Sequence, residues 1–401
     1  MKKLSLIFSL TAVLSLPLFS AQEPLVLPHI ERSPKAADFS WICPEILQKG
    51  QPDKITAPHT LDVRSCDISA WDFRQYTAQE LADILTFDSK TKFPAKNKLP
   101  KGFSVKKIFQ NGKKPGLGVA ALHKQGITGK NVSVAIIDQN LLVTHQEYKN
   151  QLVWYEEDPW WQQAEDSSMH ASAVASILAG KTVGVAPQVN LFLFAPSFGK
   201  SDENQYDAGP IAHMLRRVAE LNRQLPAAQK IRVVSISRGF GPHDLAAAEF
   251  AAAQKALEDD GVAVFTTNDV FTLSRAHSLA APDKLPYCRP AYWFDKSKLP
   301  LYSQITDITV PTDFRVLASP TGNKDYVHYA NGGLSWAVPY VAGLYALSVQ
   351  VKPDLTKAEF IQAVAATNQT QNCVWQEVKF TSLLVNPQKL IQYLQAKAGT
   401  R

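Results

Sequence analysis

The sequence predicts an α/β fold of three layers, in which a central and mainly parallel β-sheet is flanked by helices on both faces. Four apolar runs are typical of strands that are buried on both faces, namely Val132–Ile137, Leu191–Phe194, Ile231–Ile236 and Val262–Thr266. Helical patterns lie between them, at His170–Leu178, Ile211–Leu225 and Leu245–Leu257. Strands and helices that alternate in this way form parallel sheets covered on both sides.

The regions before and after this alternation complete the division of the chain. Residues 1–21 combine Lys2 and Lys3 with an apolar run and small residues, which is typical of a secretory signal peptide. Residues 22–103 form an N-terminal extension of unknown role, and residues 104–401 form the main domain. That domain ends with two further helical patterns, Lys357–Ala366 and Gln388–Lys397.

The extension gives weaker signals. The stretches WICPEILQ and TAQELADILTF are short helical candidates, and LDVRSCDISAWDF alternates like a short pair of strands. Three fates of the extension remain open, since it could be cut off, pack on the main domain or assist its folding.

Composition narrows the class of protein. The chain has 401 residues, 45% apolar and 19% charged, and can bury a large core. Without Lys2 and Lys3, 40 basic residues (42 minus 2) face 36 acidic ones, a weak and unclustered excess that does not predict a nucleic-acid partner. The later apolar run Val338–Val349 is shorter than the roughly 20 residues that span a bilayer. We therefore expect no membrane insertion and an exported protein, periplasmic or extracellular, of unassigned oligomeric state.

Four cysteines, at positions 43, 66, 288 and 373, allow three pairings in an oxidising compartment. The expected pairs are Cys43 with Cys66 and Cys288 with Cys373, and the alternative is that one or both pairs are free buried thiols. No spacing of cysteine and histidine resembles a zinc site, and no cofactor is predicted.

Three short stretches carry the residue types that activate a hydroxyl nucleophile. Asp138 lies near the end of VSVAIIDQN, His170 opens the helical pattern in SSMHASAVASILAG, and Ser335 opens that in NGGLSWAVPYVAGLYAL. An α/β-hydrolase needs its histidine after its serine. None of the nine histidines follows Ser335, which excludes that fold although GLSWA is close to Gly-x-Ser-x-Gly.

The order Asp, His, Ser and the segments around it resemble the subtilisin-like serine peptidases, in a divergent bacterial branch of that family. GVAALHKQGITGKNVSVAIID resembles the entry helix and first catalytic strand, and HASAVASILAG with VGVAPQVNLFLF resembles the histidine helix and next strand. VVSISRGF resembles the substrate-binding edge and GVAVFTTND the strand before the oxyanion asparagine. These segments occur in the family's order over more than half the chain. The resemblance implies a subtilisin-like fold for the main domain and a secreted serine endopeptidase that forms an acyl-enzyme on a protein or peptide substrate.

The resemblance also implies a role for each matching residue. Ser335 would be the nucleophile, His170 the general base and Asp138 the group that orients the imidazole. Asn268 would help to stabilise the oxyanion. The substrate would lie extended against Ser237, Arg238 and Gly239. Because Arg238 stands where the family more often has an apolar residue, we expect a preference for an acidic or polar side chain in the adjoining subsite.

Several neighbours of these residues depart from the family's pattern. Ala171, Ser172 and Ala173 replace the usual Gly-Thr-His, Leu334 and Trp336 flank the serine, and Thr267 precedes Asn268 where glycine is usual. These departures motivate the main alternative, a catalytically inactive binding protein on the same fold, and a hydrolase of esters or other acyl substrates is a further one. No calcium-binding loop can be matched residue by residue.

Each site residue also has a purely structural interpretation. Asp138 could form a turn, His170 could be a satisfied residue at a helix start, Ser335 could be an N-cap, and Asn268 could belong to an ordinary turn. The retention of all three reacting groups favours the enzyme. We interpret His145 as structural and expect the Trp160–Trp161 pair to cover core or form the rim of a pocket.

Overall fold

The computed structural model describes residues 25–51, 60–160, 164–197, 206–273, 304–375 and 378–399. The predicted signal peptide, Trp161 and Cys288 lie outside the described residues, as does the side chain of Cys373. The expected Cys288–Cys373 pair therefore stays a prediction.

The central sheet has six strands in the order β1-β5-β6-β4-β7-β8, and all neighbouring pairs are parallel. The four predicted runs form β4, β6, β7 and β8. The strands are β1 (His29–Ile30), β4 (Ser133–Ile137), β5 (Leu152–Glu157), β6 (Asn190–Ala195), β7 (Ile231–Ile236) and β8 (Ala263–Phe265). The predicted parallel sheet is confirmed, with β1 and β5 added at one edge.

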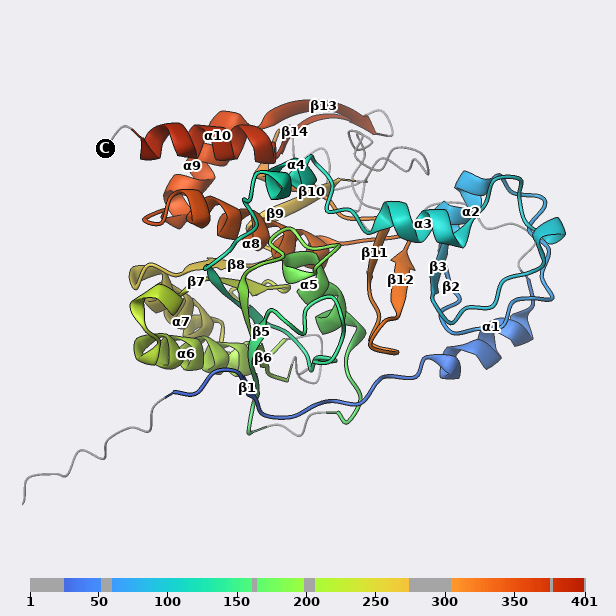
Figure 1. Cartoon of the computed structure of the whole chain (residues 1–401), viewed down its shortest axis with the longest axis horizontal. Helices are drawn as coiled ribbons and strands as arrows, with labels where there is room; N and C mark the ends of the chain where they lie inside the picture. Colours follow the sequence, from blue (N-terminus) through green and yellow to red (C-terminus); the bar gives the residue numbers. More distant parts are fainter. Residues whose placement is uncertain are drawn as a thin grey trace, which may run out of the picture.

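Helices cover both faces of this sheet (Figure 1). Val134 and Ile136 of β4 pack in one apolar cluster with α5 (Met169–Ala179) and α8 (Leu334–Val351). The alternate residues Ala135 and Ile137 pack in a second cluster with α6 (Gly209–Gln224) and α7 (Ala247–Asp259). Successive side chains of a strand point to opposite faces, so a strand buried on both faces must be apolar throughout. The three-layer α/β fold is confirmed.

Helix α8 is the central helix of the main domain. Its 18 residues are long and apolar enough to cross a membrane by length and composition, but most of them are buried inside the protein. Its apolar surface contacts β7 on one side and the second sheet on the other. That sheet has the order β13-β14-β10-β9. The elements of this region are α4 (Val119–Lys124), β9 (Val270–Leu273), β10 (Gln304–Pro311), α9 (Lys357–Thr367), β13 (Gln369–Trp375), β14 (Val378–Leu384) and α10 (Pro387–Ala398).

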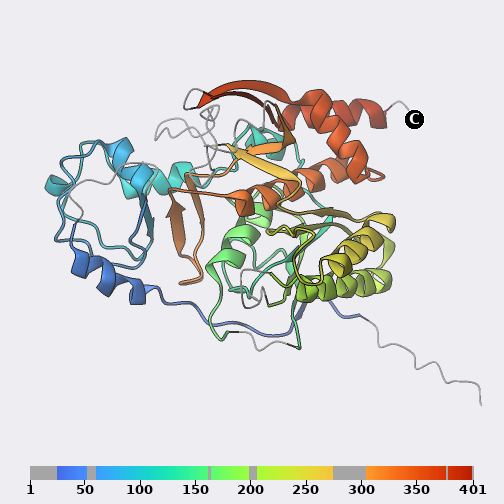
Figure 2. The ribbon, with the colours of Figure 1, turned by 180° about the vertical axis from the view of Figure 1, so that it is seen from behind.

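The N-terminal extension packs on the main domain through a third sheet, of order β11-β12-β3-β2. Strand β3 pairs with β12 in antiparallel fashion, so that one sheet contains strands from both regions. Ile84 and Phe87 share a buried cluster with Phe314 and Val316. The elements of this region are α1 (Cys43–Lys49), β2 (Leu61–Asp62), α2 (Ala78–Ile84), β3 (Leu85–Asp88), α3 (Val105–Gly112), β11 (Arg315–Ala318) and β12 (Tyr326–Tyr329), with short 3-10 turns at Ser40–Ile42 and Lys96–Lys98; a further 3-10 turn, Ala227–Gln229, lies between α6 and β7. This region forms one end of the molecule, opposite the described C-terminal helices (Figures 1 and 2).

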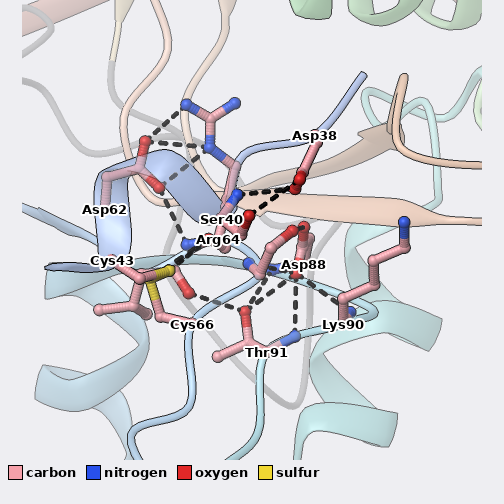
Figure 3. The surroundings of a disulfide bond; sticks show 11 residues. Asp38, Ser40, Cys43, Asp62, Arg64, Cys66, Asp88, Lys90 and Thr91 are labelled. Carbon is pink, nitrogen blue, oxygen red and sulfur yellow. Dashed lines mark hydrogen bonds and ion pairs between the residues drawn. A yellow bond between two sulfur atoms is a disulfide. The ribbon is translucent and has the colours of Figure 1, made fainter. Parts of the chain in front are cut away.

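The expected Cys43–Cys66 disulfide is present and joins α1 to the loop after β2 (Figure 3). Next to it, the carboxylate of Asp88 accepts hydrogen bonds from the backbone of Ser65 and of Thr91, both at 2.9 Å. The side chain of Asp88 is buried, and these donors compensate the loss of water. The extension is thus held together by a covalent link and a buried carboxylate.

Two expectations for the extension are wrong in detail. LDVRSCDISAWDF does not form a strand pair, because only Leu61–Asp62 is a strand and its partner is β3, in parallel. Ser65 adopts a positive φ of 60°, which breaks extended structure and lets its backbone reach Asp88. TAQELADILTF is helical only to Ile84, because the following residues enter the third sheet as β3.

Candidate active site

The predicted site residues come from neighbouring strands that end at one edge of the central sheet. Asp138 follows β4, Ser237 follows the adjacent β7, and Thr267 and Asn268 follow β8. Because parallel strands all end on the same side, the loops after them gather there, as in other open α/β sheets. His170 and Ser335 reach this edge from the N-terminal turns of α5 and α8.

Asp138 and His170 are in direct contact. The Nδ1 atom of His170 lies 2.8 Å from Oδ1 and 3.0 Å from Oδ2 of the carboxylate. The Asp138 side chain is fully buried, and the backbone N–H of Gln139 donates to its Oδ1 at 2.8 Å. Since Nδ1 faces the carboxylate, Nε2 is the ring nitrogen left for a proton donor on the other side.

The pKa of His170 follows from two opposing effects. Burial lowers this pKa because it disfavours the charged ring, whereas the charge of Asp138 and its hydrogen bond raise it. The effect of Asp138 wins, so the pKa lies above the ordinary value of 6.5. An imidazole in this setting is a stronger base than a free one, and its protonated form is stabilised.

The loops that carry Asp138 and His170 are also joined to each other. Ser168 caps α5 by accepting a hydrogen bond from the backbone of His170 at 3.0 Å, and its hydroxyl donates to the side chain of Gln139. The backbone N–H of Ser168 donates to the carbonyl of Asn140 at 2.8 Å. Gln139 and Ser168 are not among the predicted site residues. A serine two residues before His170, at the start of a helical pattern, is the signal that could have indicated the cap.

Ser335 is the second residue of α8, beside the free N–H groups and the positive end of the helix dipole. The chain reaches this position through Gly332, where an added Cβ would lie only 2.3 Å from the carbonyl oxygen of Thr312. Glycine is therefore required for the close approach that sets the start of α8.

Ser335 and Ser237 exchange a pair of hydrogen bonds. The Ser335 hydroxyl donates to the carbonyl of Ser237 at 3.3 Å, and the Ser237 hydroxyl donates to the carbonyl of Ser335 at 2.9 Å. The second bond has a cause within the helix. Pro339 lacks the N–H that would bond to the carbonyl four residues earlier, which belongs to Ser335. Ser237 supplies the missing donor.

The two halves of the site adjoin through Trp336. Its indole packs against the imidazole of His170, with 5.4 Å between ring centroids, and against Tyr329 at 5.5 Å. The structure thus brings Asp138 and His170 into contact and places the start of α8 beside them. The Ser335 hydroxyl itself points to Ser237, so a rotation about its Cα–Cβ bond is needed to direct it elsewhere.

A pocket of about 500 Å³ opens at this edge of the sheet, and it contains all three predicted substrate-binding residues. Its lining consists of Gln139, His170, Tyr206, Ser237, Arg238, Gly239 and Thr267. The guanidinium of Arg238 lies over the ring of Tyr206, 3.7 Å from the centroid, and burial lowers its pKa. Tyr206 is not among the predicted residues, because nothing in its local sequence links it to Arg238.

Asn268 lies next to the loop after β7. Its side chain is exposed, and its amide nitrogen donates to the carbonyl of Phe240 at 3.2 Å. A Cβ at Gly239 would lie 2.3 Å from the side-chain Oδ1 of Asn268, so these two residues touch. Across the described parts of the chain, no group of three or more His, Cys, Asp or Glu side chains is placed to hold a metal ion.

His145 and Trp160 lie outside this site. His145 is buried, with Nε2 2.8 Å from the carbonyl of Asp325, and burial lowers its pKa. The ring is therefore neutral near pH 7 and links two loops, in line with the structural interpretation. Trp160 is 70% exposed and stacks on His213 at 3.9 Å, so it does not cover core.

Comparisons with known proteins show what the chain is similar to. The subtilase family profile matches residues 129–287. The chain is 25% identical over 267 residues to the major intracellular serine protease of Bacillus subtilis, an alignment that covers 63% of this chain and 75% of that one. It is 24% identical over 250 residues to a subtilisin-like protease of Coccidioides posadasii, over 59% of this chain and 48% of that one.

The family match and these relatives support a subtilase-family peptidase. The same matches support a serine-type endopeptidase. Among solved structures, the prenylagaramide maturation protease PagA has a TM-score of 0.51 at 15% identity, over 70% of this chain and 99% of that one. This likeness concerns the fold.

The unusual residues after the histidine have a packing role in this protein. Ala171, Ser172 and Ala173 are all fully buried in α5, which packs against α8. Small side chains let the two helices approach closely, because little volume separates their backbones. These three departures from the family's pattern therefore affect packing and leave the contact between His170 and Asp138 intact.

Proposed function

We propose that this subtilase hydrolyses peptide bonds through a triad of Ser335, His170 and Asp138, with an acyl-enzyme intermediate. The observation that carries the proposal is the double contact of the His170 Nδ1 with the buried carboxylate of Asp138, beside the N-terminus of the Ser335 helix. A buried carboxylate in this position fixes the ring orientation and stabilises the imidazolium that forms during acyl transfer.

The chemistry proceeds by proton transfers within the site. The Ser335 hydroxyl rotates from the Ser237 carbonyl to Nε2 of His170, which takes its proton as the oxygen attacks the peptide carbonyl. Collapse of the tetrahedral intermediate breaks the peptide bond, and His170 passes the proton to the leaving amine. Water then repeats the sequence on the acyl-enzyme and regenerates the free serine.

The oxyanion is the point where charge develops in this reaction. The backbone N–H of Ser335 lies at a helix N-terminus and would donate to it, with the Asn268 amide as a second donor. Asn268 must first exchange its bond to the Phe240 carbonyl for one to the substrate. A donor of this kind typically contributes about 3 to 4 kcal/mol to transition-state stabilisation.

The substrate is a protein or peptide that lies extended along Ser237, Arg238 and Gly239, where it adds main-chain hydrogen bonds. The pocket beside His170 supports this placement, because these three residues line it. The chemistry needs no cofactor, and neither nucleic acid nor membrane insertion is part of the proposal.

The protein is proposed to act after export, in the periplasm or outside the cell. The sequence of residues 1–21 supports this location, and so does the Cys43–Cys66 disulfide, since such bonds persist mainly in oxidising compartments.

Labelling with a fluorophosphonate probe tests the proposal. The wild type should be labelled, and Ser335→Ala should not be labelled while it keeps its fold by circular dichroism. Removal of Ser335 or His170 should lower kcat by up to about 10⁶-fold, the size of the corresponding loss in subtilisin. Label that persists in Ser335→Ala would refute the assignment of the nucleophile. A folded wild type that takes up no label would favour the inactive binding protein instead.

A further inference from the structure

The segment formed by residues 29–37, here called the N-terminal strap, is part of the central sheet. His29 and Ile30 pair with Trp154 and Tyr155 of β5 in parallel register, and the backbone of Glu31 donates to Tyr155 at 3.1 Å. In both overall views, this segment runs from the extension along the main domain to β1 (Figures 1 and 2). The first described part of the chain therefore forms the edge strand β1 and then crosses the main domain toward α1.

The strap is bonded to the loop that leads into α5. The backbone N–H of Lys35 donates to the carbonyl of Glu165 at 2.9 Å, and Ser167 donates back to Lys35 at 2.8 Å. From the other side, the Asn140 side chain donates to the carbonyl of Ala164 at 3.0 Å. The residues just before His170 are thus held between the strap and the loop that follows Asp138.

Arg32 is the side chain that joins the strap to both loops. Its guanidinium makes a two-pronged contact with Glu157, at 2.7 and 2.9 Å, and also donates to the carbonyl of Ala164 at 2.9 Å. The same Glu157 carboxylate accepts the hydroxyl of Tyr155. That hydroxyl accepts the backbone N–H of Leu141 at 3.3 Å, three residues after Asp138.

These bonds form a continuous chain from Arg32 to the loop after β4, and each group in it orients the next one. The planar guanidinium fixes Glu157, the carboxylate fixes the Tyr155 hydroxyl, and the buried tyrosine fixes the loop after β4. Neither Arg32, Glu157 nor Tyr155 touches the triad. An effect on the reaction would have to pass through the positions of Asp138 and His170.

We propose that Arg32 is a positioning residue for catalysis, and that the strap stays in the active enzyme because it holds the two loops that carry Asp138 and His170. This inference rests on the proposed function. It also assigns part of the N-terminal extension a permanent place in the working protein, in contrast to a segment that is removed on activation.

The test compares Arg32→Ala with the wild type in the full exported chain. We expect kcat to fall about tenfold with little change in KM, because a loosened contact between Asp138 and His170 weakens transition-state stabilisation without altering the substrate pocket. The acid limb of the kcat/KM profile should move to lower pH, since His170 loses part of the effect that raises its pKa. Arg32→Lys should recover only part of kcat, because an ammonium cannot make the two-pronged contact.

Tyr155→Phe tests the same path at a second point and keeps the shape of the buried ring. The double variant Arg32→Ala/Tyr155→Phe should lose less than the product of the two single losses, since both changes break one path. Arg216→Ala is the matched control. Arg216 lies on α6 and forms a loose ion pair with the exposed Glu249 of α7, at 3.8 Å. This control should keep kcat and the pH profile.

Two results would overturn the inference while leaving the triad intact. One is a wild type labelled at Ser335 together with Arg32→Ala and Tyr155→Phe variants whose kcat and acid limb are unchanged. The other is an intact mass of the active protein that lacks residues 29–37. A wild type without label at Ser335 would instead overturn the proposed function, and this inference with it.

Discussion

The two halves of the active site are built in different ways. The acid–imidazole half is tightly bonded, because Asp138 is fully buried, His170 contacts both of its carboxylate oxygens, and Ser168, Gln139 and the strap hold the surrounding loops. The serine half depends on one partner, since the hydroxyl and carbonyl of Ser335 both bond to Ser237. The group that must change direction during the reaction is therefore the one held by fewer bonds.

This difference has a physical reason. A charge can be kept in a buried site only when its partners are fixed in place, because an unpaired buried carboxylate costs several kcal/mol. The serine hydroxyl is neutral and needs only a modest hydrogen bond, typically worth about 1 kcal/mol net, so rotation away from Ser237 costs little. The fold thus fixes the base in advance and leaves the nucleophile free to turn.

Asp138→Asn should lower kcat more than the changes to Ser237 or Arg238, because it removes the charge from the acid–imidazole half of the site. An amide cannot accept two contacts from Nδ1 as the carboxylate does, and the ring is free to take the wrong tautomer. We expect kcat to fall about 10⁴-fold, the magnitude seen for this change in a Ser-His-Asp protease. Steady-state kinetics on a peptide substrate measure it. A loss under tenfold would show that Asp138 does not orient the base.

Ser237→Ala should disturb the serine half of the site, with a smaller loss of kcat. It removes the donor to the Ser335 carbonyl that Pro339 leaves unpaired, and a partly buried carbonyl without a donor costs up to about 3 kcal/mol. We expect kcat to fall about tenfold and the melting temperature to drop, as measured by kinetics and thermal unfolding.

Ser235→Ala is the matched control for Ser237→Ala. It removes a buried hydroxyl from β7, the strand that Ser237 follows, and this hydroxyl has no hydrogen-bond partner among the described residues. This variant should keep kcat. Equal losses in the two variants would show that the strand, and not the bond to Ser335, matters.

The pH dependence of kcat/KM reports the protonation of His170 in the acid–imidazole half. Asp138 raises the pKa of His170 above 6.5 despite the opposing effect of burial, and only the neutral ring can accept the serine proton. The acid limb of kcat/KM should therefore have its midpoint above pH 6.5 in the wild type and below it in Asp138→Asn, where burial alone remains. A midpoint that is the same in both proteins would contradict this account.

The same shift also affects stability. Because the folded pKa is raised, the contact between Asp138 and protonated His170 stabilises the fold fully below pH 6.5 and is lost as the pH rises through the higher folded value. Thermal unfolding across this range should show the loss in the wild type and not in His170→Ala.

Much of the acid–imidazole half could be predicted from the sequence, whereas the N-terminal strap could not. Apolar runs such as Val132–Ile137 reveal strands that are buried on both faces, and Asp138 follows directly after one of them. Strand β5 ends in Glu156 and Glu157, which do not resemble a buried strand. Their partners Arg217 and Arg32 lie 61 and 125 residues away along the chain. No local pattern records such pairings.

The direction of the Ser335 hydroxyl illustrates a similar limit. Its position at a helix start is evident from the serine, the preceding glycines and the apolar pattern that follows. Its partner depends on the loop after β7, almost 100 residues earlier in the chain. Likewise, the residues of β3 continue the pattern of α2 and become a strand because β2 and β12 offer them backbone partners. Tertiary contacts decide such cases.

Arg238→Glu should have the smallest effect on turnover and the clearest effect on selectivity. Arg238 lines the pocket beside His170 with its guanidinium on Tyr206, and a cation there favours an acidic substrate side chain. We expect the wild type to prefer acidic over basic side chains in one subsite by about tenfold, and Arg238→Glu to reverse that preference, as measured by kcat/KM on a peptide series. Arg216→Glu makes the same charge change on the helical layer and should leave the preference as it is. Since the change lies outside the contact between Asp138 and His170, the acid limb of the pH profile should stay in place. An Arg238→Glu profile that moves with the preference would show that the two parts of the pocket are coupled.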